Sequence, residues 1–231
     1  MPVKAIADVS VGAVARVAAA ARANAGEQSR YGIFPGYRHR ITPSYFDDTV
    51  NTDDWQREVY EFAVQLMDKE QLASVYDVGC GSGYKLVHYL GKYATTGFDV
   101  DETVAFLESR YPDRQWRSAP FSERGLPPVD LVICSDVIEH VDDPDQLLAF
   151  IDAVPSRYII ISTPERDLLY RMGGRRNFGP PANTTHMREW SFRELASYIG
   201  STFEILDHKV TNPVQGTQMV LCERTHPAPL A

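Results

Sequence analysis

The alternation of short apolar runs with helical patterns is the feature of this sequence that most restricts its fold. The predicted strands are, in chain order, 74–79, 95–100, 115–119, 129–135 and 157–163, and the predicted helices between them are 84–93, 102–112 and 144–154. Strands that alternate with helices of about ten residues form a parallel sheet with helices on both faces. The runs "DLVIC" and "YIIIS" are continuously apolar, as expected for strands buried on both faces. The pattern therefore predicts a doubly wound α/β fold.

Further elements are predicted on either side of this core. A helix that ends near Glu70 is indicated by one apolar stripe, formed by Trp55, Val59, Phe62 and Leu66. Residues 162–190 are predicted to form a long loop, and Ser191 and Glu194 then have the spacing of a capping box at the start of a helix. Two more strands, within 203–224, are expected to form a closing hairpin.

Residues 1–50 are predicted to form a helix followed by a lid-like segment. The alanine-rich stretch 3–28 carries apolar residues at helical intervals, namely Ile6, Val9, Val14 and Val17. We expect an amphipathic helix that packs on the domain or on a second subunit, giving a homodimer; a transit peptide is the alternative. Residues 31–54 are rich in glycine, proline and aromatic residues, which is typical of a loop over a binding site. Residues 51–225 are predicted to form one domain.

Composition limits the possible partners. The net charge is −8 over 231 residues, which disfavours nucleic acid and favours small molecules as ligands. The three cysteines form no CxxC pair and no metal-ligand cluster is visible, so a reducing cytoplasm and a site without metal are expected. No apolar run approaches the roughly 18 residues of a membrane span, so none is predicted.

A glycine-rich loop, "VYDVGCGSGYKL" at 75–86, directly follows the first predicted strand. A phosphate-binding P-loop needs Ser or Thr after its lysine, but Leu86 follows Lys85. The dinucleotide fingerprint places its third glycine where this chain has Tyr84. The loop therefore matches neither phosphate-binding class.

Two aspartates indicate a cationic ligand instead. Asp77 ends the first strand, where a carboxylate would repel a pyrophosphate but attract an ammonium or sulfonium group. Asp99 ends the second strand, where nucleotide-binding folds place the acid that binds ribose hydroxyls. S-adenosyl-L-methionine carries these cationic groups and a ribose without phosphate, so it is preferred to NAD as the ligand.

Four stretches together resemble a class I S-adenosylmethionine-dependent methyltransferase. They are "VYDVGCGSGYKL", "TGFDVD", "DLVICSDVIEHVDDP" and "IIISTPER". The pattern is most similar to small-molecule O-methyltransferases of the ubiquinone-biosynthesis type and to relatives in polysaccharide and natural-product pathways. The resemblance covers roughly residues 50–225 and implies a Rossmann-like, seven-stranded sheet whose last strand is antiparallel.

The resemblance also implies positions that bind the cofactor. Those around its methionine part are Asp77, Gly79, Cys80, Gly81 and Gly83. Asp99 would bind the ribose and Val100 would pack on the adenine. Ser118 and Ala119 align with the adenine edge, a position where the family often has an aspartate. Asp136 and Val137 would line the donor site.

Methyl transfer to a hydroxyl needs a group that accepts the acceptor's proton. His186, His140 and Asp136 are the candidate catalytic residues, because histidine titrates near neutral pH and a carboxylate can assist it. Each has a second interpretation. His186 could cap or bond a loop, His140 could be structural, and Asp136 could serve the electrostatics of the cofactor alone.

Four residues are predicted to bind the acceptor. Tyr37 and Tyr45 belong to the aromatic lid-like segment, while Arg166 and Arg188 belong to the arginine-rich loop after the fifth strand. Arginine binds carboxylates and phosphates in a bidentate manner, which would suit an anionic or sugar-linked acceptor. A solvated loop that balances nearby acids is the alternative.

The resulting hypothesis is S-adenosylmethionine-dependent methylation of a hydroxyl on a saccharide or secondary metabolite. N- or C-methylation of a small molecule is the nearest alternative. A catalytically inactive, cofactor-binding partner in a complex and an NAD-dependent reductase are the remaining possibilities.

Overall fold

The computed structural model describes residues 31–44, 46–171 and 178–224. The predicted N-terminal helix, with any dimer contact that it makes, and Tyr45 lie outside the described residues. Within them, none of the helices has the length and apolar character that a membrane span requires.

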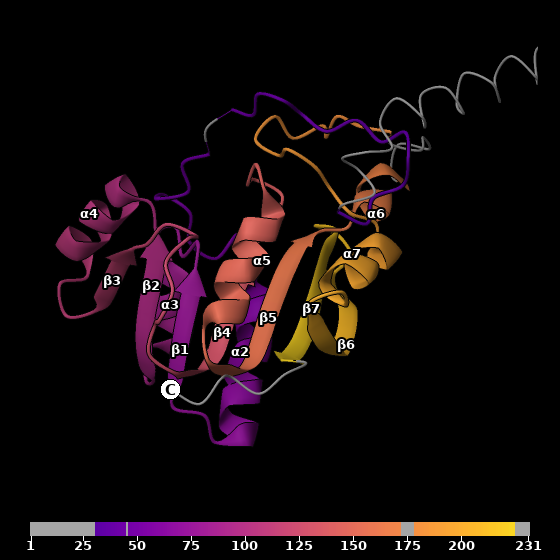
Figure 1. The fold of residues 1–231 in the computed structure, drawn as a ribbon. Helices are drawn as coiled ribbons and strands as arrows, with labels where there is room; N and C mark the ends of the chain where they lie inside the picture. Colours follow the sequence, from indigo (N-terminus) through magenta and orange to yellow (C-terminus); the bar gives the residue numbers. More distant parts are fainter. Residues whose placement is uncertain (1–30, 45, 172–177, 225–231) are drawn as a thin grey trace, which may run out of the picture.

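A single mixed sheet organises the domain (Figure 1). Its strands are β1 (Ser74–Val78), β2 (Ala94–Asp99), β3 (Gln115–Ser118), β4 (Val129–Ser135), β5 (Ser156–Pro164), β6 (Phe203–Asn212) and β7 (Thr217–Arg224). They are arranged in the order β3-β2-β1-β4-β5-β7-β6. Strands β1 to β5 pair in parallel, whereas β7 is antiparallel to both β5 and β6. The predicted seven-stranded sheet with an antiparallel last strand is confirmed.

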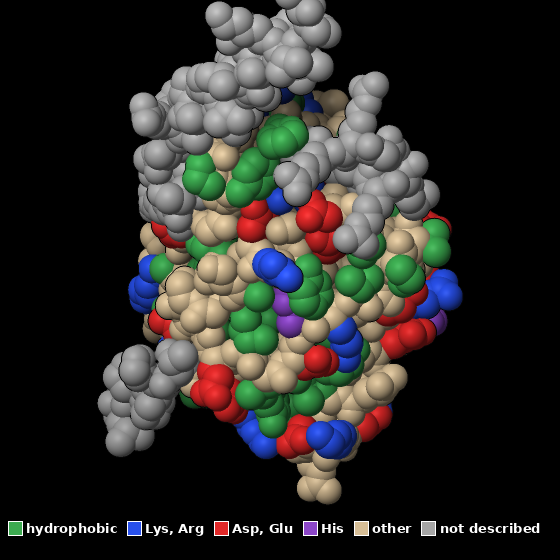
Figure 2. Space-filling view, turned by 90° about the vertical axis from the view of Figure 1, so that its right-hand side faces the viewer, with side chains coloured by type: hydrophobic (Ala, Val, Ile, Leu, Met, Phe, Trp, Pro, Cys, Tyr) green, Lys and Arg blue, Asp and Glu red, His purple; other side chains and the backbone are tan. Residues whose placement is uncertain are grey.

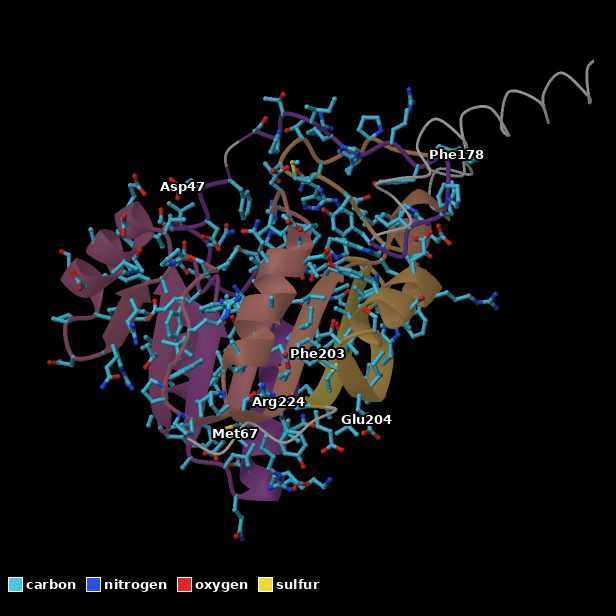
Figure 3. The ribbon with its side chains drawn as sticks, in the orientation of Figure 1. Asp47, Met67, Phe178, Phe203, Glu204 and Arg224 are labelled. Atoms are coloured by element: carbon cyan, nitrogen blue, oxygen red, sulfur yellow. The ribbon has the colours of Figure 1, made fainter. Side chains whose placement is uncertain are left out.

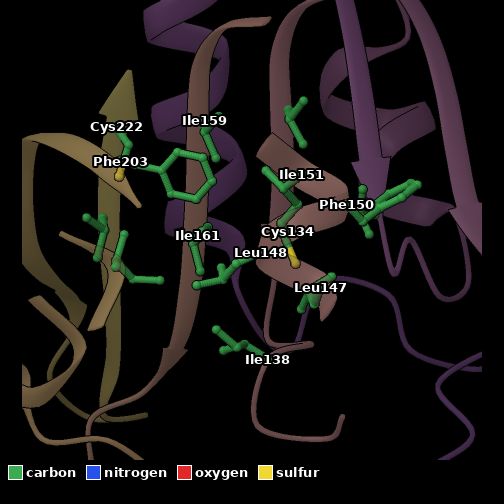
Figure 4. Packing of buried hydrophobic residues seen from close by; sticks show 14 of the residues in the cluster. Cys134, Ile138, Leu147, Leu148, Phe150, Ile151, Ile159, Ile161, Phe203 and Cys222 are labelled. Atoms are coloured by element: carbon green, nitrogen blue, oxygen red, sulfur yellow. The ribbon is translucent and has the colours of Figure 1, made fainter. Parts of the chain in front are cut away.

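Helices cover both faces of the sheet. They are α2 (Arg57–Glu70), α3 (Tyr84–Leu90), α4 (Asp101–Arg110), α5 (Pro144–Ala153), α6 (Arg166–Arg171) and α7 (Phe192–Ile199). One apolar core joins the sheet to α5 and α7, and a second joins its other face to α2, α3 and α4. In β5, Ile159 and Ile161 belong to the first core (Figure 4), while Ile160 belongs to the second. This alternation explains why the strand is continuously apolar.

The strand order places a ligand site at one edge of the sheet. From β1 the chain proceeds outward to β2 and β3, and then returns to the other side of β1 to form β4 and β5. The carboxyl ends of these strands meet where the order reverses, which is where open α/β sheets bind ligands. In Figure 3, the labelled Asp47 and Phe178 lie on segments above this edge, while Phe203 and Arg224 lie toward the opposite one.

The two long predicted loops lie side by side above that edge. The backbone amides of Arg38, Arg40 and Ser44 donate to the carbonyls of Phe178, Met187 and Thr184, at 2.7, 2.7 and 2.9 Å. Segments 31–44 and 178–190 therefore form one hydrogen-bonded layer over the carboxyl ends of the strands (Figure 1).

Two local predictions need correction. Trp55 precedes α2 instead of belonging to its apolar stripe, because the backbone of Gln56 is left-handed, with φ 63°, and the helix begins only after it. The predicted loop 162–190 contains the short helix α6, whose first turn is capped by the Glu165 carboxylate through the amide of Leu168. The capping box of Ser191 and Glu194 is present at α7 as predicted.

Candidate active site

A cavity of about 880 Å³ opens above the carboxyl ends of the central strands. Its walls come from the turn after β1, the ends of β2 and β4, segment 43–56 and segment 182–189. The volume lies within the usual range of small-molecule sites. Three strand ends and two segments that are distant in the chain thus contribute to one pocket.

The turn after β1 is shaped by glycines with left-handed backbones. Gly79 has φ 75°, and a Cβ there would lie 2.2 Å from Cγ2 of Val137. Gly81 has φ 51°, and a Cβ there would lie 1.8 Å from Oδ2 of Asp48. A side chain is therefore excluded at both positions by backbone conformation and by space. The turn lies directly against Val137 and the Asp48 carboxylate.

Asp99 and Val100 occupy the positions expected for nucleoside recognition. Asp99 accepts hydrogen bonds from the amides of Gly81 and Val100, both at 2.8 Å, and both Asp99 and Val100 line the cavity. The Val100 side chain is 51% exposed and presents an apolar surface to the cavity. Ser118 and Ala119 do not line this cavity, since Ala119 packs on the first apolar core.

Asp77 lies beneath the glycine turn and does not line the cavity. Its side chain is fully buried and accepts a hydrogen bond from Oη of Tyr60 at 2.9 Å. Burial raises the pKa of Asp77 to about 7. The Cys80 side chain also points into the core, against Gly97. Neither side chain lines the cavity, so both lie behind the glycine turn that was predicted to surround the methionine part of the cofactor.

The three candidate catalytic residues meet at one wall of the cavity. Asp136, Glu139 and His140 follow β4, and His186 comes from the covering segment. Asp136 has a left-handed backbone, with φ 54°, and its Oδ1 accepts a hydrogen bond of 2.7 Å from the Ser162 hydroxyl. Burial raises the pKa of Asp136. Strained backbones of this kind are common at functional sites, where they direct a side chain.

Glu139 and His140 present free ligand atoms to each other. Oε2 of Glu139 accepts a hydrogen bond from Thr163 at 2.9 Å, whereas its buried Oε1 has no hydrogen-bond partner among the described residues. Nδ1 of His140 lies 3.0 Å from the carbonyl oxygen of Thr185, so this nitrogen carries the proton. Nε2 of His140 lies 3.9 Å from Oε1 of Glu139. Burial, followed by the nearby His186, lowers the pKa of His140 to about 4, which keeps the ring neutral.

His186 is oriented by two side chains of its own segment. Its Nδ1 lies 2.8 Å from Oε1 of Glu189, and its Nε2 lies 2.9 Å from Nδ2 of Asn183. The amide of Glu189 donates to Oη of Tyr37 at 3.1 Å, which links this pair to segment 31–44. The rings of His140 and His186 are perpendicular, with centroids 4.8 Å apart.

This group has the composition of a metal centre. Glu139, His140 and His186 offer ligand atoms that all lie within 4.8 Å of one another. Two imidazoles with a carboxylate suit divalent cations such as Mn²⁺, Fe²⁺ or Zn²⁺. The unpartnered Oε1 of Glu139 is consistent with such an ion. The grouping was not expected from the sequence, because His186 lies far along the chain from the Glu139-His140 pair.

Of the residues predicted to bind the acceptor, Tyr37, Arg166 and Arg188 are described, and each has contacts within the protein. Arg166 and Arg188 are each 3% exposed and do not line the cavity. Arg166 pairs with Glu194 at 2.7 Å, and Arg188 donates to the carbonyls of Val141 and Asp142, both at 2.8 Å. Tyr37 is completely buried. These side chains hold the covering segments in place and are not available to a ligand.

Phe46 belongs to the aromatic segment that the sequence predicts to be lid-like. It stacks on His140, with centroids 5.2 Å apart, and covers this wall of the cavity. Trp55 lines the cavity as well, and so do Asp48 and Lys85, which were not predicted to do so. Segment 43–56 has no periodicity, so only its aromatic and acidic composition could have indicated these positions.

Comparisons with known proteins agree with this geometry. Residues 51–201 match the family model described as "Methyltransferase domain". The small RNA 2'-O-methyltransferase of Mus musculus is 24% identical over 197 residues, covering 68% of this chain and 45% of that protein. The mitochondrial ubiquinone biosynthesis O-methyltransferase of Saccharomyces cerevisiae is 26% identical over 212 residues, covering 79% and 65%. The chain thus spans less than two thirds of the length of either relative.

One solved structure shows the same fold with a bound cofactor product. Magnesium protoporphyrin IX methyltransferase from Synechocystis PCC 6803, with bound S-adenosyl-L-homocysteine, has a TM-score of 0.56 to this chain at 16% identity. The superposition covers 73% of this chain and 83% of the other.

Proposed function

Since this chain belongs to the methyltransferase-domain family and takes S-adenosyl-L-methionine as its methyl donor, we propose that it methylates a hydroxyl oxygen of a small molecule. The observation that carries the proposal is the group of Glu139, His140 and His186 at the cavity wall. We assign to this group the binding of a divalent cation and of the acceptor hydroxyl.

A hydroxyl acceptor explains why such a group is present. As the acceptor oxygen attacks the methyl carbon, the carbon–sulfur bond breaks and a neutral thioether leaves, so the protein must orient the two reactants and receive one proton. A divalent cation at this group, when bound, would lower the pKa of the hydroxyl. An unprotonated amine carries its own lone pair and needs no such activation. Both curated relatives named above are O-methyltransferases.

The remaining side chains of the site support this role. Thr185 and Glu189 hold the Nδ1 atoms of His140 and His186, which leaves their Nε2 atoms as candidate ligand atoms. Partners of this kind fix the orientation of metal-bound histidines. Asn183 donates to Nε2 of His186, so an ion at this atom requires the amide to turn away. Phe46 covers His140 and limits the access of water.

The charge of the cavity favours a small molecule over RNA. Of the described lining residues, five are acidic, namely Asp48, Asp99, Asp136, Glu139 and Glu189, whereas Lys85 is the one lysine or arginine. This surface would repel a phosphate backbone. On the face shown in Figure 2, the described acidic and basic side chains are interspersed and form no basic stripe. RNA 2'-hydroxyl methylation is a second candidate, because of the relative from Mus musculus.

The proposal is tested by methyl transfer to three kinds of acceptor. Formation of S-adenosyl-L-homocysteine is measured with a panel of catechols and saccharides, with matched aromatic amines, and with a short single-stranded RNA. Each is assayed after treatment with EDTA and after re-addition of Mn²⁺ or Zn²⁺. We expect turnover of a hydroxyl compound that EDTA abolishes and a cation restores.

Other outcomes would refute parts of the proposal. Turnover of amines alone would refute the hydroxyl acceptor, and turnover of RNA alone would refute the small molecule. Undiminished turnover after chelation would refute the cation. As a matched pair, His186→Asn should lose turnover, whereas His88→Asn, at an exposed position on α3, should retain it.

A further inference from the structure

We propose that Gln56 is a positioning residue for methyl transfer, whose side-chain amide holds the Asp136 carboxylate in the orientation in which it meets the acceptor. The inference rests on the proposed function for the presence of an acceptor. Gln56 directly precedes α2 and lines the cavity together with Asp136. It belongs to none of the four stretches that resemble the methyltransferase family.

Gln56 has a left-handed backbone that the start of the helix does not require. Its φ is 63°, whereas the residue that caps the N-terminus of a helix normally has an extended backbone. Its side chain forms no capping hydrogen bond with the first turn of α2. In a residue other than glycine this conformation is unfavourable, and such residues gather at functional sites. The direction that it gives to the Gln56 side chain accounts for the conformation.

That side chain acts on the Asp136 carboxyl. Gln56 donates a hydrogen bond to it, in addition to the one from the Ser162 hydroxyl at 2.7 Å. Burial raises the pKa of Asp136, and both hydrogen bonds act against the effect of burial. The Ser162 hydroxyl is in turn bonded to that of Ser135, at 2.7 Å. The two serines belong to the sheet and Gln56 to the segment before α2, so two separate parts of the fold hold the carboxylate.

Left-handed backbones occur at both residues of this contact. Among the described residues, three other than glycine have this conformation, namely Gln56, Gln71 and Asp136. Gln71 ends α2, and its amide donates to the carbonyl of Met67, which is the usual role of the conformation at a helix C-terminus. Gln56 and Asp136 instead both line the cavity. The unfavourable conformation without a role in ending a helix is thus found where the two side chains meet.

The backbone around Gln56 is anchored to the turn between β6 and β7. Nε2 of Gln215 donates to the carbonyl of Asp54 at 2.6 Å. Nδ2 of Asn212 donates to the Glu58 carboxylate at 2.9 Å. Since residues on both sides of Gln56 are held, its side chain has few directions available. Groups held in this way keep a reacting partner in place without further loss of entropy.

The orientation of Asp136 matters because the acceptor oxygen must lie in line with the methyl–sulfur bond. A carboxylate that is held by donors on two sides can accept the hydrogen bond of the acceptor hydroxyl from a defined direction. Without the Gln56 amide, the carboxylate can rotate and the acceptor is held less precisely. The loss should therefore appear in kcat and not in the affinity for the donor product.

Gln56→Gly and Gln71→Gly form a matched pair of variants. Glycine adopts a left-handed backbone without strain, so both should keep a Tm close to that of the natural protein. Gln56→Gly should nevertheless lower kcat by about 10- to 100-fold, the loss expected for a hydrogen bond to a charged group. Its Kd for S-adenosyl-L-homocysteine, measured by calorimetry, should stay within about twofold. Gln71→Gly, at an exposed position at the other end of α2, should retain its kcat.

A cycle of variants shows whether Gln56 acts through Asp136. Gln56→Met keeps the length of the side chain and removes the donor, and Asp136→Gly removes the carboxylate from a left-handed position. Gln56→Met should lower kcat in the natural protein and have no further effect in the Asp136→Gly background. The midpoint of chemical unfolding is measured for the same four proteins and requires no turnover. Gln56→Met should lower the midpoint in the natural protein but not in the Asp136→Gly background.

Unchanged kcat in Gln56→Gly would overturn the proposal, and so would equal effects of Gln56→Met in both backgrounds. A loss of affinity for S-adenosyl-L-homocysteine as large as the loss of kcat would also overturn it, because Gln56 would then bind the donor. The kinetic assays use the acceptor that the panel described above identifies. Methylation of an amine with the same pattern of losses would refute the hydroxyl acceptor and leave the positioning role of Gln56 standing.

Discussion

Nδ1 of His186 lies 2.8 Å from Oε1 of Glu189, and both side chains are buried in the segment that covers the active site. The pair resembles the orienting contacts that fix the tautomer of catalytic and metal-bound histidines. The backbone amide of Glu189 donates a hydrogen bond to the Tyr37 hydroxyl, which links this pair to segment 31–44.

Glu189→Gln should lower kcat by about 10- to 100-fold, because an amide orients the imidazole less strongly than a carboxylate does. The affinity for S-adenosyl-L-homocysteine should not change, since Glu189 lies on the acceptor side of the cavity. Steady-state kinetics and calorimetry check the two parts. Glu204→Gln, at an exposed position on β6, is the matched control and should behave as the natural protein does.

Asp77→Asn should stabilise the ligand-free protein above pH 7. The pKa of Asp77 is raised to about 7 in the folded state by burial, while the unfolded chain has the ordinary value of 3.8. The folded protein therefore retains a proton that the unfolded chain releases, and the free energy of unfolding falls as the pH rises from about 4 to about 7.

Asparagine cannot ionise and still accepts the Tyr60 hydrogen bond, so the free energy of unfolding should no longer fall between pH 4 and pH 7. A gain of about 2 kcal/mol in this free energy would raise Tm by about 4–8 °C at pH 8. Thermal unfolding between pH 4 and pH 8 measures the change in Tm. Equal pH profiles of the natural protein and the variant would contradict the role of this carboxyl. Asp68→Asn, at a surface carboxyl whose pKa is lowered by Lys92, should show no such gain.

Gly81→Ala should destabilise the turn after β1 for two separate reasons. A left-handed backbone costs alanine about 1 kcal/mol, and its Cβ collides with the Asp48 carboxylate. The double variant Gly81→Ala, Asp48→Ala removes the collision but not the backbone cost. We expect chemical unfolding to show that the double variant is less destabilised than the sum of the two single variants, by at least about 0.5 kcal/mol. Additive effects would show that the two residues do not touch.

Arg166→Met should destabilise the protein by about 2–5 kcal/mol, because it leaves the Glu194 carboxylate without its partner at 2.7 Å. The acceptor KM of any folded fraction should not change, since Arg166 does not line the cavity. Unfolding curves and kinetics with a hydroxyl acceptor separate the two roles. A raised KM with normal stability would instead support acceptor binding.

The sheet and its connections were predictable because they depend on repeated, local patterns. Buried strands such as Ile159–Ile161 require continuous apolar residues, and the glycine turn requires small residues at fixed positions. The approximate positions of Asp99, Asp136 and His140 followed directly, since each comes at or just after the end of a strand. Residues at strand ends could be placed because the strands themselves could be predicted.

The acceptor side was not predictable in the same way. Arg166 and Arg188 have the composition of a binding loop, but burial cannot be read from composition, and their partners are distant backbone carbonyls and Glu194. Asp48 was missed because segment 43–56 has no periodic pattern, and Lys85 was considered only as the lysine of a phosphate-binding loop. The metal-like group was missed because it forms only when the segment of His186 folds back over β4.

The three backbone hydrogen bonds between residues 38–44 and 178–187 have a consequence for engineering. The two segments are about 140 residues apart in the chain, yet they form one layer, and an exchange of either segment alone would break the bonds that hold the other. A chimera that imports both segments from one donor protein preserves the layer. An exchange that is meant to alter this cover of the cavity should therefore transfer the two segments together.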